Sequence, residues 1–412
     1  MNSIPILKES PLATAWRMLL CLLAAQLIVS FVGRSLAPLS VLISKDLSLT
    51  HAQIGMLPAA LFFGQSLAAI PSGILVDRIG SKKQLLIVII ILALGFVMIA
   101  KSNAFLLLLI FVVIAGGAYG AMHPTTNRGI LYWFPQQKRG MAMGIKQMGI
   151  TGGSALAAIV LLPLANSIGW RMALILSCGL LLLIGILSSL YYRDPDRKEE
   201  ITASSEKISI AKQFRKMFKN KPLLLISISA MGLQGAQLCL TTYIVLFAFE
   251  HLTFSLVIAG TLLVIAEIGG SVGRVGWGTI SDVILKGKRM PIMYLVTLIT
   301  ACCALLLTLL QPGSSLLYTM SIIFIFGFCI SGYNGVWMNI VTELVPKEES
   351  GLATGITITI SSLGVMFIPP FFGFLIDKSG AFSAGWLFIV LLMGGIIFLL
   401  RSTSIALKNS KC

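Results

Sequence analysis

Two charged residues stand out because each falls inside a long apolar run. Arg34 lies between Gly33 and Pro38 in the first run, and Glu267 lies in a later run, seven residues before Arg274. A charged side chain deep in a membrane is costly, so it normally faces a polar cavity or a partner. A guanidinium can hold an oxyanion by two parallel hydrogen bonds, and a buried carboxyl can bind and release a proton. The pattern indicates anion binding at Arg34 and proton coupling at Glu267, with a permanent ion pair between them as the alternative.

Other basic side chains in these runs have both a functional and a structural interpretation. Arg274 shares a helix face with Glu267 but stands near the end of its run, which favours a gating or structural salt bridge. Arg128 has the same ambiguity and the same favoured role. His123, in the middle of a helix, could bond an anion or relay a proton, or could be a simple buried hydrogen-bonding group. Lys146 could attract anions in a cavity, or could extend to the lipid headgroups.

Uncharged polar residues are candidates for the lining of the same cavity. Gln234 and Gln237 are three residues apart and therefore share a helix face, and Tyr119, Tyr333 and Asn334 lie within other apolar runs. Such groups can set substrate specificity by hydrogen bonding. They can equally hold helices together.

Membrane-spanning helices have to position these side chains. Of the 412 residues, 57% are hydrophobic and 11% are charged, whereas a soluble domain is about 25% charged. A run of about 20 apolar residues can cross the hydrocarbon layer as a helix. The sequence predicts an all-α membrane protein with twelve such helices, at 16–43, 53–76, 84–100, 104–133, 141–166, 170–192, 222–249, 254–282, 291–310, 315–344, 350–376 and 382–401.

The net charge of +16 is distributed unevenly along the chain. With the N-terminus inside, 23 of the 31 Lys and Arg residues fall in cytoplasmic segments. This is the asymmetry of the positive-inside rule. It predicts a multi-pass protein of the cell membrane with both termini in the cytoplasm, in contact with membrane lipids, and it removes the need for a nucleic-acid partner.

Segments of the first half recur in the second half at an offset of about 205 to 216 residues. The stretch from Gly73 through Asp77 is echoed by Gly278 through Asp282, and Gly169-Trp170 is echoed by Gly385-Trp386. The repeat predicts two pseudo-symmetric six-helix bundles at 1–192 and 222–412. A working site on the axis between two such halves, operated by rocking, is the usual arrangement.

A polar linker at 193–221 separates the two halves. It holds nine basic and five acidic residues. Ile210, Phe214, Met217 and Phe218 recur within it at helical spacing among basic residues, which favours a helix on the anionic inner leaflet. A solvated basic linker is the alternative.

The segment Gly73-Ile-Leu-Val-Asp77-Arg78-Ile-Gly80-Ser-Lys82-Lys83, with its weaker repeat at Asp282, resembles the signature loop of the major facilitator superfamily. The resemblance covers essentially the whole chain. It implies the twelve-helix transporter fold, with gating or structural roles for Asp77, Arg78 and Asp282.

At finer grain, the stretch from Pro124 to Pro135 resembles the end of helix 4 in the anion:cation symporter group and in cyanate- and nitrate-type carriers. Arg34 sits where these groups often have a substrate-binding arginine. The chain departs from the proton-coupled organic-anion members at Gly33, where they have an acid, and at Val112 and Tyr119, where they have an arginine and a glutamate. Their coupling scheme therefore does not transfer directly.

Several classes of function are excluded by what the sequence does not contain. No ATP site, catalytic constellation or metal-ligand cluster is recognisable, and the seven cysteines show no CxxC spacing, so no enzyme activity, cofactor or metal is expected. We expect a secondary transporter that moves a small organic or inorganic anion by proton symport or anion exchange and works as a monomer. Proton-driven efflux of drugs or other amphipathic compounds is the alternative.

Overall fold

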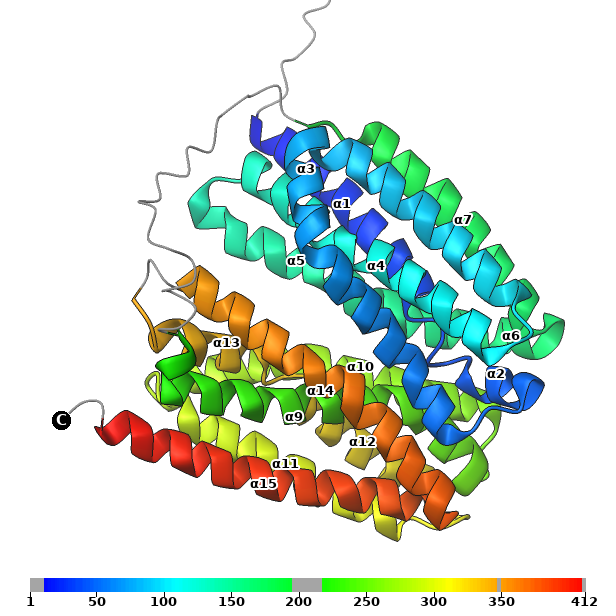
Figure 1. The fold of residues 1–412 in the computed structure, drawn as a ribbon, viewed down its shortest axis with the longest axis vertical. Coiled ribbons are helices and arrows are strands. Elements are labelled where there is room, and N and C mark those ends of the chain that lie inside the picture. The colour runs from blue at the N-terminus through cyan, green and yellow to red at the C-terminus, as the bar shows by residue number, and fades with distance from the viewer. Residues whose placement is uncertain (1–10, 195–216, 347–349, 410–412) are drawn as a thin grey trace, which may run out of the picture.

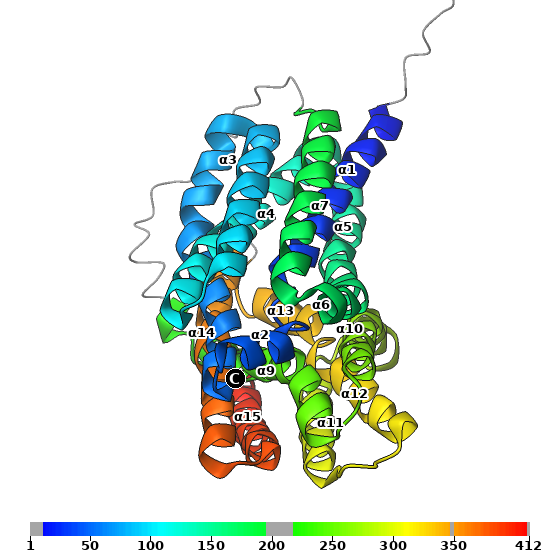
Figure 2. The same cartoon turned by 90° about the vertical axis from the view of Figure 1, so that its right-hand side faces the viewer.

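The computed structural model describes residues 11–194, 217–346 and 350–409, and over these residues the chain folds into two groups of helices (Figures 1 and 2). The first group precedes the linker and forms the N-half. It consists of α1 (Pro11–Gly33), α2 (Ser40–Leu47), α3 (His51–Lys101), α4 (Phe105–Trp133), α5 (Gln136–Leu156), a π-helical turn η1 (Ala157–Leu161), α6 (Leu162–Ile168) and α7 (Trp170–Tyr191).

The second group follows the linker and forms the C-half. It consists of α9 (Lys221–Leu246), η2 (Phe247–His251), α10 (Leu256–Thr279), η3 (Ile280–Ile284), α11 (Met290–Leu309), α12 (Leu316–Ile330), α13 (Asn334–Glu343), α14 (Ser350–Ser379) and α15 (Phe382–Asn409). The two π-helical turns η2 and η3 continue the helices that precede them.

The number of membrane crossings agrees with the twelve expected from the sequence. Eleven helices in the described part of the chain are long and apolar enough to span a membrane. One of them, α3, has 51 residues, which corresponds to about 77 Å of helix, more than twice the thickness of the hydrocarbon layer. At Gly80 its backbone leaves the helical conformation, with φ of 86°. The helix α3 therefore supplies two crossings, and the predicted fold is confirmed.

The break at Gly80 is held by the first residues of the linker. Glycine permits the positive φ, which a side chain would strain. The two oxygens of Asp194 accept hydrogen bonds from the backbone N–H groups of Ser81 and Lys82 at 3.1 and 3.0 Å, and Lys82 Nζ donates to the carbonyl oxygen of Leu190. The signature loop is thus tied to the end of α7, and the second part of α3 begins with a capped N-terminus.

The first predicted helix is interrupted, which the sequence analysis did not expect. It was predicted as one span at 16–43, but α1 ends at Gly33 and α2 begins at Ser40. Pro38 has no N–H and disfavours helical geometry in the residue before it. The predicted span at 315–344 is also divided, because residues 331–333 form a turn between α12 and α13.

Apolar packing fills the interior of both halves, and further apolar side chains cover the outside. One cluster of buried residues extends through both halves. Large apolar side chains also remain exposed on the outer surface, for example Ile70, Leu391 and Phe398. An apolar exterior of this kind suits contact with lipid chains. The predicted surface helix of the linker falls mostly on residues 195–216, outside the described residues.

The halves approach each other most closely at one end of the molecule. There the start of α3 crosses α14 and α9, whereas α5 meets α10 nearer the middle. Figure 1 shows the two groups of ribbons diverging toward the side where the C-terminus lies. We call the end where α3 begins the His51 end, and the opposite end, where the linker leaves α7, the linker end.

Candidate functional site

A cavity lies between the two halves and receives side chains from both. The N-half contributes the turn after α1, part of α3, and one residue each from α4 and α5, and the C-half contributes α9 and α10. The lining residues are Gly33, Arg34, Leu36, Ala37, Ile54, Leu57, Pro58, Leu61, Phe62, Tyr119, Ser154, Leu238, Thr241, Thr242 and Leu263. Most of this lining is apolar, and Arg34 is its one charged member.

The break in the first span explains why Arg34 reaches the cavity. Its backbone N–H still bonds to the carbonyl oxygen of Ser30, so Arg34 directly follows the last turn of α1. The carbonyl groups at the C-terminal end of a helix carry partial negative charge, which stabilises a cation there. About a quarter of the side chain, 26%, remains exposed, and it is exposed into the cavity.

Arg34 is paired with Glu267 of the other half. The Nη1 atom of Arg34 lies 3.6 Å from Oε1 of Glu267, and the Glu267 side chain is only 6% exposed. The same carboxylate oxygen accepts a hydrogen bond of 2.9 Å from the hydroxyl of Ser154 on α5. Glu267, on α10, is therefore held by two N-half residues. This contact joins the halves near the middle of the molecule, and we call it the central tie.

Tyr119 covers the other side of the guanidinium. The Nε atom of Arg34 donates to the Tyr119 hydroxyl at 3.4 Å. A Cβ atom placed on Gly33 would come within 2.5 Å of the Tyr119 ring, so any side chain there would force the ring to move. The absence of a side chain at position 33 is thus what allows the tyrosine to pack beside Arg34. These are two of the positions at which the chain departs from the organic-anion carriers.

His123 and Lys146 lie nearby in the N-half, outside the lining of the cavity. The Lys146 side chain is buried, with 2% exposed, and its Nζ donates to Oδ1 of Asn127 at 3.0 Å. His123 is half-buried and lies within electrostatic range of both Lys146 and Arg34. The N-half side of the site therefore gathers basic groups.

Arg274 and Asn334 support the turn between α12 and α13. The carbonyl oxygen of Ser331 accepts hydrogen bonds from Arg274 Nε at 3.4 Å and from Asn334 Nδ2 at 3.2 Å. Both donors compensate a carbonyl that the break leaves without its helical partner. Tyr333, in the same turn, is fully buried. These residues support the fold around the site and lie outside the lining of the cavity.

The two glutamines of α9 also lie apart from the cavity lining. Gln234 and Gln237 are half-buried, whereas Leu238, Thr241 and Thr242 of the same helix form part of the lining. Of the seven residues predicted to bind substrate, the structure thus brings Arg34 and Tyr119 together in the cavity. Ser154, Thr241 and Thr242 are the polar lining residues outside that prediction, and short hydroxyl side chains in apolar helices give little signal because they are common at helix contacts.

Among the described residues, the ion pairs at the linker end lie within each half. In the N-half, Arg128 Nε lies 3.8 Å from Asp77, and its Nη2 donates to the Tyr132 hydroxyl at 3.1 Å. Arg78, beside Asp77, is exposed. The contacts of Arg128 join the signature loop to α4 in the N-half.

The C-half has a corresponding cluster around Arg289, one of the basic residues that follow Asp282 in the repeated motif. Arg289 lies 3.7 Å from Asp282 and 2.7 Å from Glu343. Asp282, the repeat counterpart of Asp77, is thus paired with Arg289, while Arg274 bonds to a backbone carbonyl instead.

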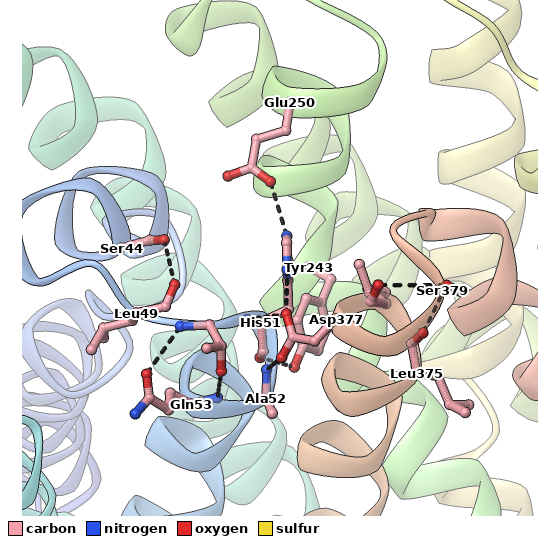
Figure 3. A network of polar contacts seen from close by, with 12 residues as sticks. Ser44, Leu49, His51, Ala52, Gln53, Tyr243, Glu250, Leu375, Asp377 and Ser379 are labelled. Atoms are coloured by element: carbon pink, nitrogen blue, oxygen red, sulfur yellow. Dashed lines mark hydrogen bonds and ion pairs between the residues drawn. The ribbon is translucent and has the colours of Figure 1, made fainter.

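At the His51 end, by contrast, charged side chains join the two halves. His51 lies between two acids of the C-half, with Nδ1 2.8 Å from Asp377 on α14 and Nε2 3.0 Å from Glu250 on η2 (Figure 3). Asp377 also accepts hydrogen bonds of 2.9 Å from the backbone N–H groups of His51 and Ala52. We call this group the His51 tie. His51 and Asp377 were not among the functional residues predicted from the sequence.

Glycines let the backbones meet beside the His51 tie. The Tyr243 hydroxyl lies 2.8 Å from the carbonyl oxygens of both His51 and Pro369, which share its single proton as acceptors. A Cβ atom on Gly55 would overlap the Tyr243 hydroxyl and would come within 2.6 Å of the Pro369 backbone carbon. The close packing of α3, α9 and α14 therefore requires a glycine at this position.

Comparison with known proteins identifies the family. The chain matches the model of the Major Facilitator Superfamily over residues 22–367 and again over 304–411. It therefore belongs to this superfamily and is a membrane transporter, in agreement with the resemblance noted in the sequence.

Relatives within the superfamily include carriers of anions. The chain is 28% identical to an uncharacterised transporter of Mycobacterium tuberculosis, over 82% of this chain and 73% of that protein. It is 23% identical to a probable sulfoacetate transporter of Cupriavidus necator, with 92% and 91% covered. It is 25% identical to a probable nitrate transporter of Staphylococcus carnosus, with 91% and 92% covered.

Solved structures share the fold at lower sequence identity. A bacterial homologue of the human lysosomal transporter Spinster superposes with a TM-score of 0.75 at 20% identity, over 97% of this chain and 98% of that one. The nucleoside transporter NupG superposes with a TM-score of 0.77 at 17% identity, over 95% and 99%. The prediction of a transporter, and not an enzyme, is confirmed by the family.

Proposed function

We propose that the protein carries a small anion across the cell membrane together with a proton, with Arg34 as the anion-binding group and Glu267 as the proton-binding group. The observation that supports this most directly is the position of Arg34, whose guanidinium is exposed into the cavity between the halves while Glu267 lies behind it. An incoming anion would meet the guanidinium first. The two relatives named for nitrate and sulfoacetate support an anionic substrate.

The charges of the central tie supply a coupling mechanism. In the empty cavity the Arg34 cation and the Glu267 carboxylate neutralise each other across 3.6 Å. A substrate anion that forks onto the guanidinium displaces the carboxylate. An ionised carboxylate left in an apolar cavity without its cation is costly, so Glu267 then binds a proton. Ser154, which donates to the carboxylate, can rotate its hydroxyl to accept from the protonated form.

The same charges explain why a partly loaded protein would not turn over. The empty site and the site loaded with a monoanion plus a proton are both neutral. A site with the anion but no proton has one uncompensated negative charge. Moving that charge past the apolar lining of the cavity is unfavourable. Anion and proton therefore cross together, or one anion exchanges for another.

The distribution of basic residues and the contacts between the halves support an orientation in the membrane and a conformational state. The excess of basic residues supports a cytoplasmic position for the linker end under the positive-inside rule. The polar contacts described between the halves lie at the His51 end and in the middle. We infer a state closed to the outside. A single chain contributes both walls of the cavity, which supports function as a monomer.

Counterflow of labelled anions in proteoliposomes tests the proposal. Nitrate, sulfoacetate and a hexuronate are suitable probes. We expect at least one of them to exchange in the wild type, and Arg34→Ala to reduce that exchange by about 100-fold, as for the loss of one partner of a buried charge pair. Arg34→Lys retains the positive charge but lacks the planar guanidinium, so its exchange rate should lie between those of the wild type and Arg34→Ala. Arg401→Ala, at an exposed position of α15 outside the cavity lining, serves as the control. Undiminished exchange by Arg34→Ala contradicts the proposal.

The apolar lining supports a second candidate, proton-driven efflux of amphipathic compounds. Seven large apolar residues line the cavity, Leu36, Ile54, Leu57, Leu61, Phe62, Leu238 and Leu263. In this case Arg34 would be a fixed partner of Glu267. Extrusion of a cationic dye from everted vesicles, lost in Glu267→Gln while no anion exchanges, would favour efflux over anion transport.

A further inference from the structure

We propose that His51, Glu250 and Asp377 form a proton-binding site, separate from Glu267, and that a proton bound there holds the two halves closed at the His51 end. The proposal goes beyond the function proposed above because it concerns the control of closure and not the transported solute. It depends on the geometry of the three side chains shown in Figure 3.

The imidazole of His51 has a carboxylate oxygen at each of its two nitrogens. Nδ1 lies 2.8 Å from Asp377 and Nε2 lies 3.0 Å from Glu250. A neutral imidazole has one N–H donor and one acceptor nitrogen, so it can satisfy only one carboxylate. The imidazolium has two donors. The observed arrangement is therefore the one expected of a protonated histidine.

Loss of the proton would change both the bonding and the charge of the tie. The imidazolium between two carboxylates has a net charge of −1, and the neutral imidazole leaves −2. One carboxylate would then face a ring nitrogen lone pair at about 3 Å, which is repulsive. Because His51 belongs to the N-half and both acids belong to the C-half, the repulsion acts directly between the halves.

Other charged groups near the tie either have partners elsewhere or are exposed. Lys45 lies over the Phe249 ring at 4.2 Å, and Asp46 pairs with Arg171 at 2.9 Å. His251 is stacked on Phe247 and has its Nε2 3.0 Å from the carbonyl oxygen of Leu310. Lys378 is exposed beside Asp377. Phe382 of α15 packs edge-on against the His51 ring. The imidazole is thus the titratable group placed to switch the tie.

Protons can reach the site while the halves are closed. The side chains of His51, Glu250 and Asp377 remain 25%, 30% and 25% exposed. The site therefore equilibrates with the solution on its own side of the membrane, which the charge distribution assigns to the outside.

The sign of the pH effect follows from linkage. The closed state holds the proton more tightly than the open state, in which the carboxylates move away from the ring. Closure is therefore favoured when His51 is protonated and weakens as the pH rises through the histidine range. One linked proton changes the ratio of closed to open protein by up to about tenfold per pH unit.

A distance measurement between the two halves tests this. Spin labels are attached at Ala104 and Gln311, two positions on connections outside the tie, in a variant whose seven native cysteines are replaced. Double electron–electron resonance in lipid nanodiscs then gives the closed fraction between about pH 5 and pH 8. For the wild type we expect the closed fraction to fall as the pH rises.

Three variants distinguish this site from other titratable groups. In His51→Gln the closed fraction should be lower at acidic pH and should no longer depend on pH. Glu250→Gln, which leaves the backbone contacts of Asp377 in place, should make the closed fraction depend less strongly on pH. His251→Gln is the matched control and should behave as the wild type. A pH dependence unchanged by His51→Gln, a loss of it in His251→Gln, or a wild type insensitive to pH would each overturn the proposal, whatever solute the protein carries.

Discussion

The central tie and the His51 tie join the same two halves by different means. At the central tie a single carboxylate, 6% exposed, is held by one cation and one hydroxyl of the opposite half. At the His51 tie one imidazole meets two carboxylates that are a quarter or more exposed. The central tie can be opened only by something that enters the cavity, whereas the His51 tie is accessible to protons from solution. Substrate and external pH would therefore act on closure through separate groups.

After Arg34, the largest expected effect at the two ties comes from Glu267. Replacing it by glutamine removes the titratable group of the central tie and leaves a neutral side chain that can still bond to Ser154. We expect anion exchange to persist within a few-fold of the wild type, while uptake driven by an inward proton gradient falls at least about tenfold. Both rates are measured in the same proteoliposomes, with the proton gradient present or collapsed.

Glu343→Gln is the control, because Glu343 pairs with Arg289 within the C-half. Gradient-driven accumulation by Glu267→Gln at the wild-type rate would mean that protons cross elsewhere.

Steric change at the His51 end should have the next largest effect. Gly55→Ala places a Cβ against the Tyr243 hydroxyl and the Pro369 backbone. Overpacking of this kind costs about 1–3 kcal/mol, so the ratio of closed to open protein in the spin-label experiment should fall by about 5- to 150-fold. The pH dependence should remain, because the three titratable side chains are intact.

The matched control for this substitution is Gly394→Ala in α15, where nothing lies within 4 Å of the new Cβ. An unchanged closed fraction in Gly55→Ala would mean that the halves close without this backbone contact.

A smaller effect is expected at Ser154. Ser154→Ala removes a hydrogen bond of 2.9 Å to the Glu267 carboxylate. The hydroxyl helps to fix the Glu267 side chain beside Arg34, so without it the carboxyl group is held less well. We expect the rate of proton-coupled uptake to fall by about fivefold. The measurement is the initial uptake rate under an inward proton gradient, and a rate equal to that of the wild type contradicts the assignment.

The smallest effect is expected at Tyr119. Tyr119→Phe removes only the 3.4 Å hydrogen bond from Arg34 Nε and retains the ring that packs beside Gly33. Since a hydrogen bond of this length contributes little, the KM for the anion should change by less than about threefold. A much larger increase in KM would indicate that the hydroxyl contacts the substrate directly.

The helices could be predicted from the sequence because length and apolarity determine which segments cross a membrane. The interruption at Arg34 was missed because the apolar run continues through it, and hydropathy does not report backbone geometry. Pro38 was the available signal. The division between α12 and α13, at Ser331-Gly332-Tyr333, had no proline to mark it.

The two ties also differ in how far their residues could be predicted from the sequence. Arg34 and Glu267 were found because charges are rare at such depth. His51 and Asp377 are ordinary residues for the end of a span, and they are 326 positions apart in the chain. Their meeting depends on how α3 docks on α14, which no local pattern encodes. Whether Gln234 and Gln237 face the cavity depends on how α9 is rotated about its own axis. The spacing of the two residues in the sequence does not determine that rotation.

The packing of Tyr119 over Gly33 links these two positions in evolution. Any acquisition of an acidic residue at position 33 would collide with the aromatic ring, so it would first require a smaller residue at position 119. The pair is therefore expected to covary among descendants of this gene. Conversion toward the acid-bearing carriers would proceed through a double replacement, since the single change at position 33 is sterically blocked.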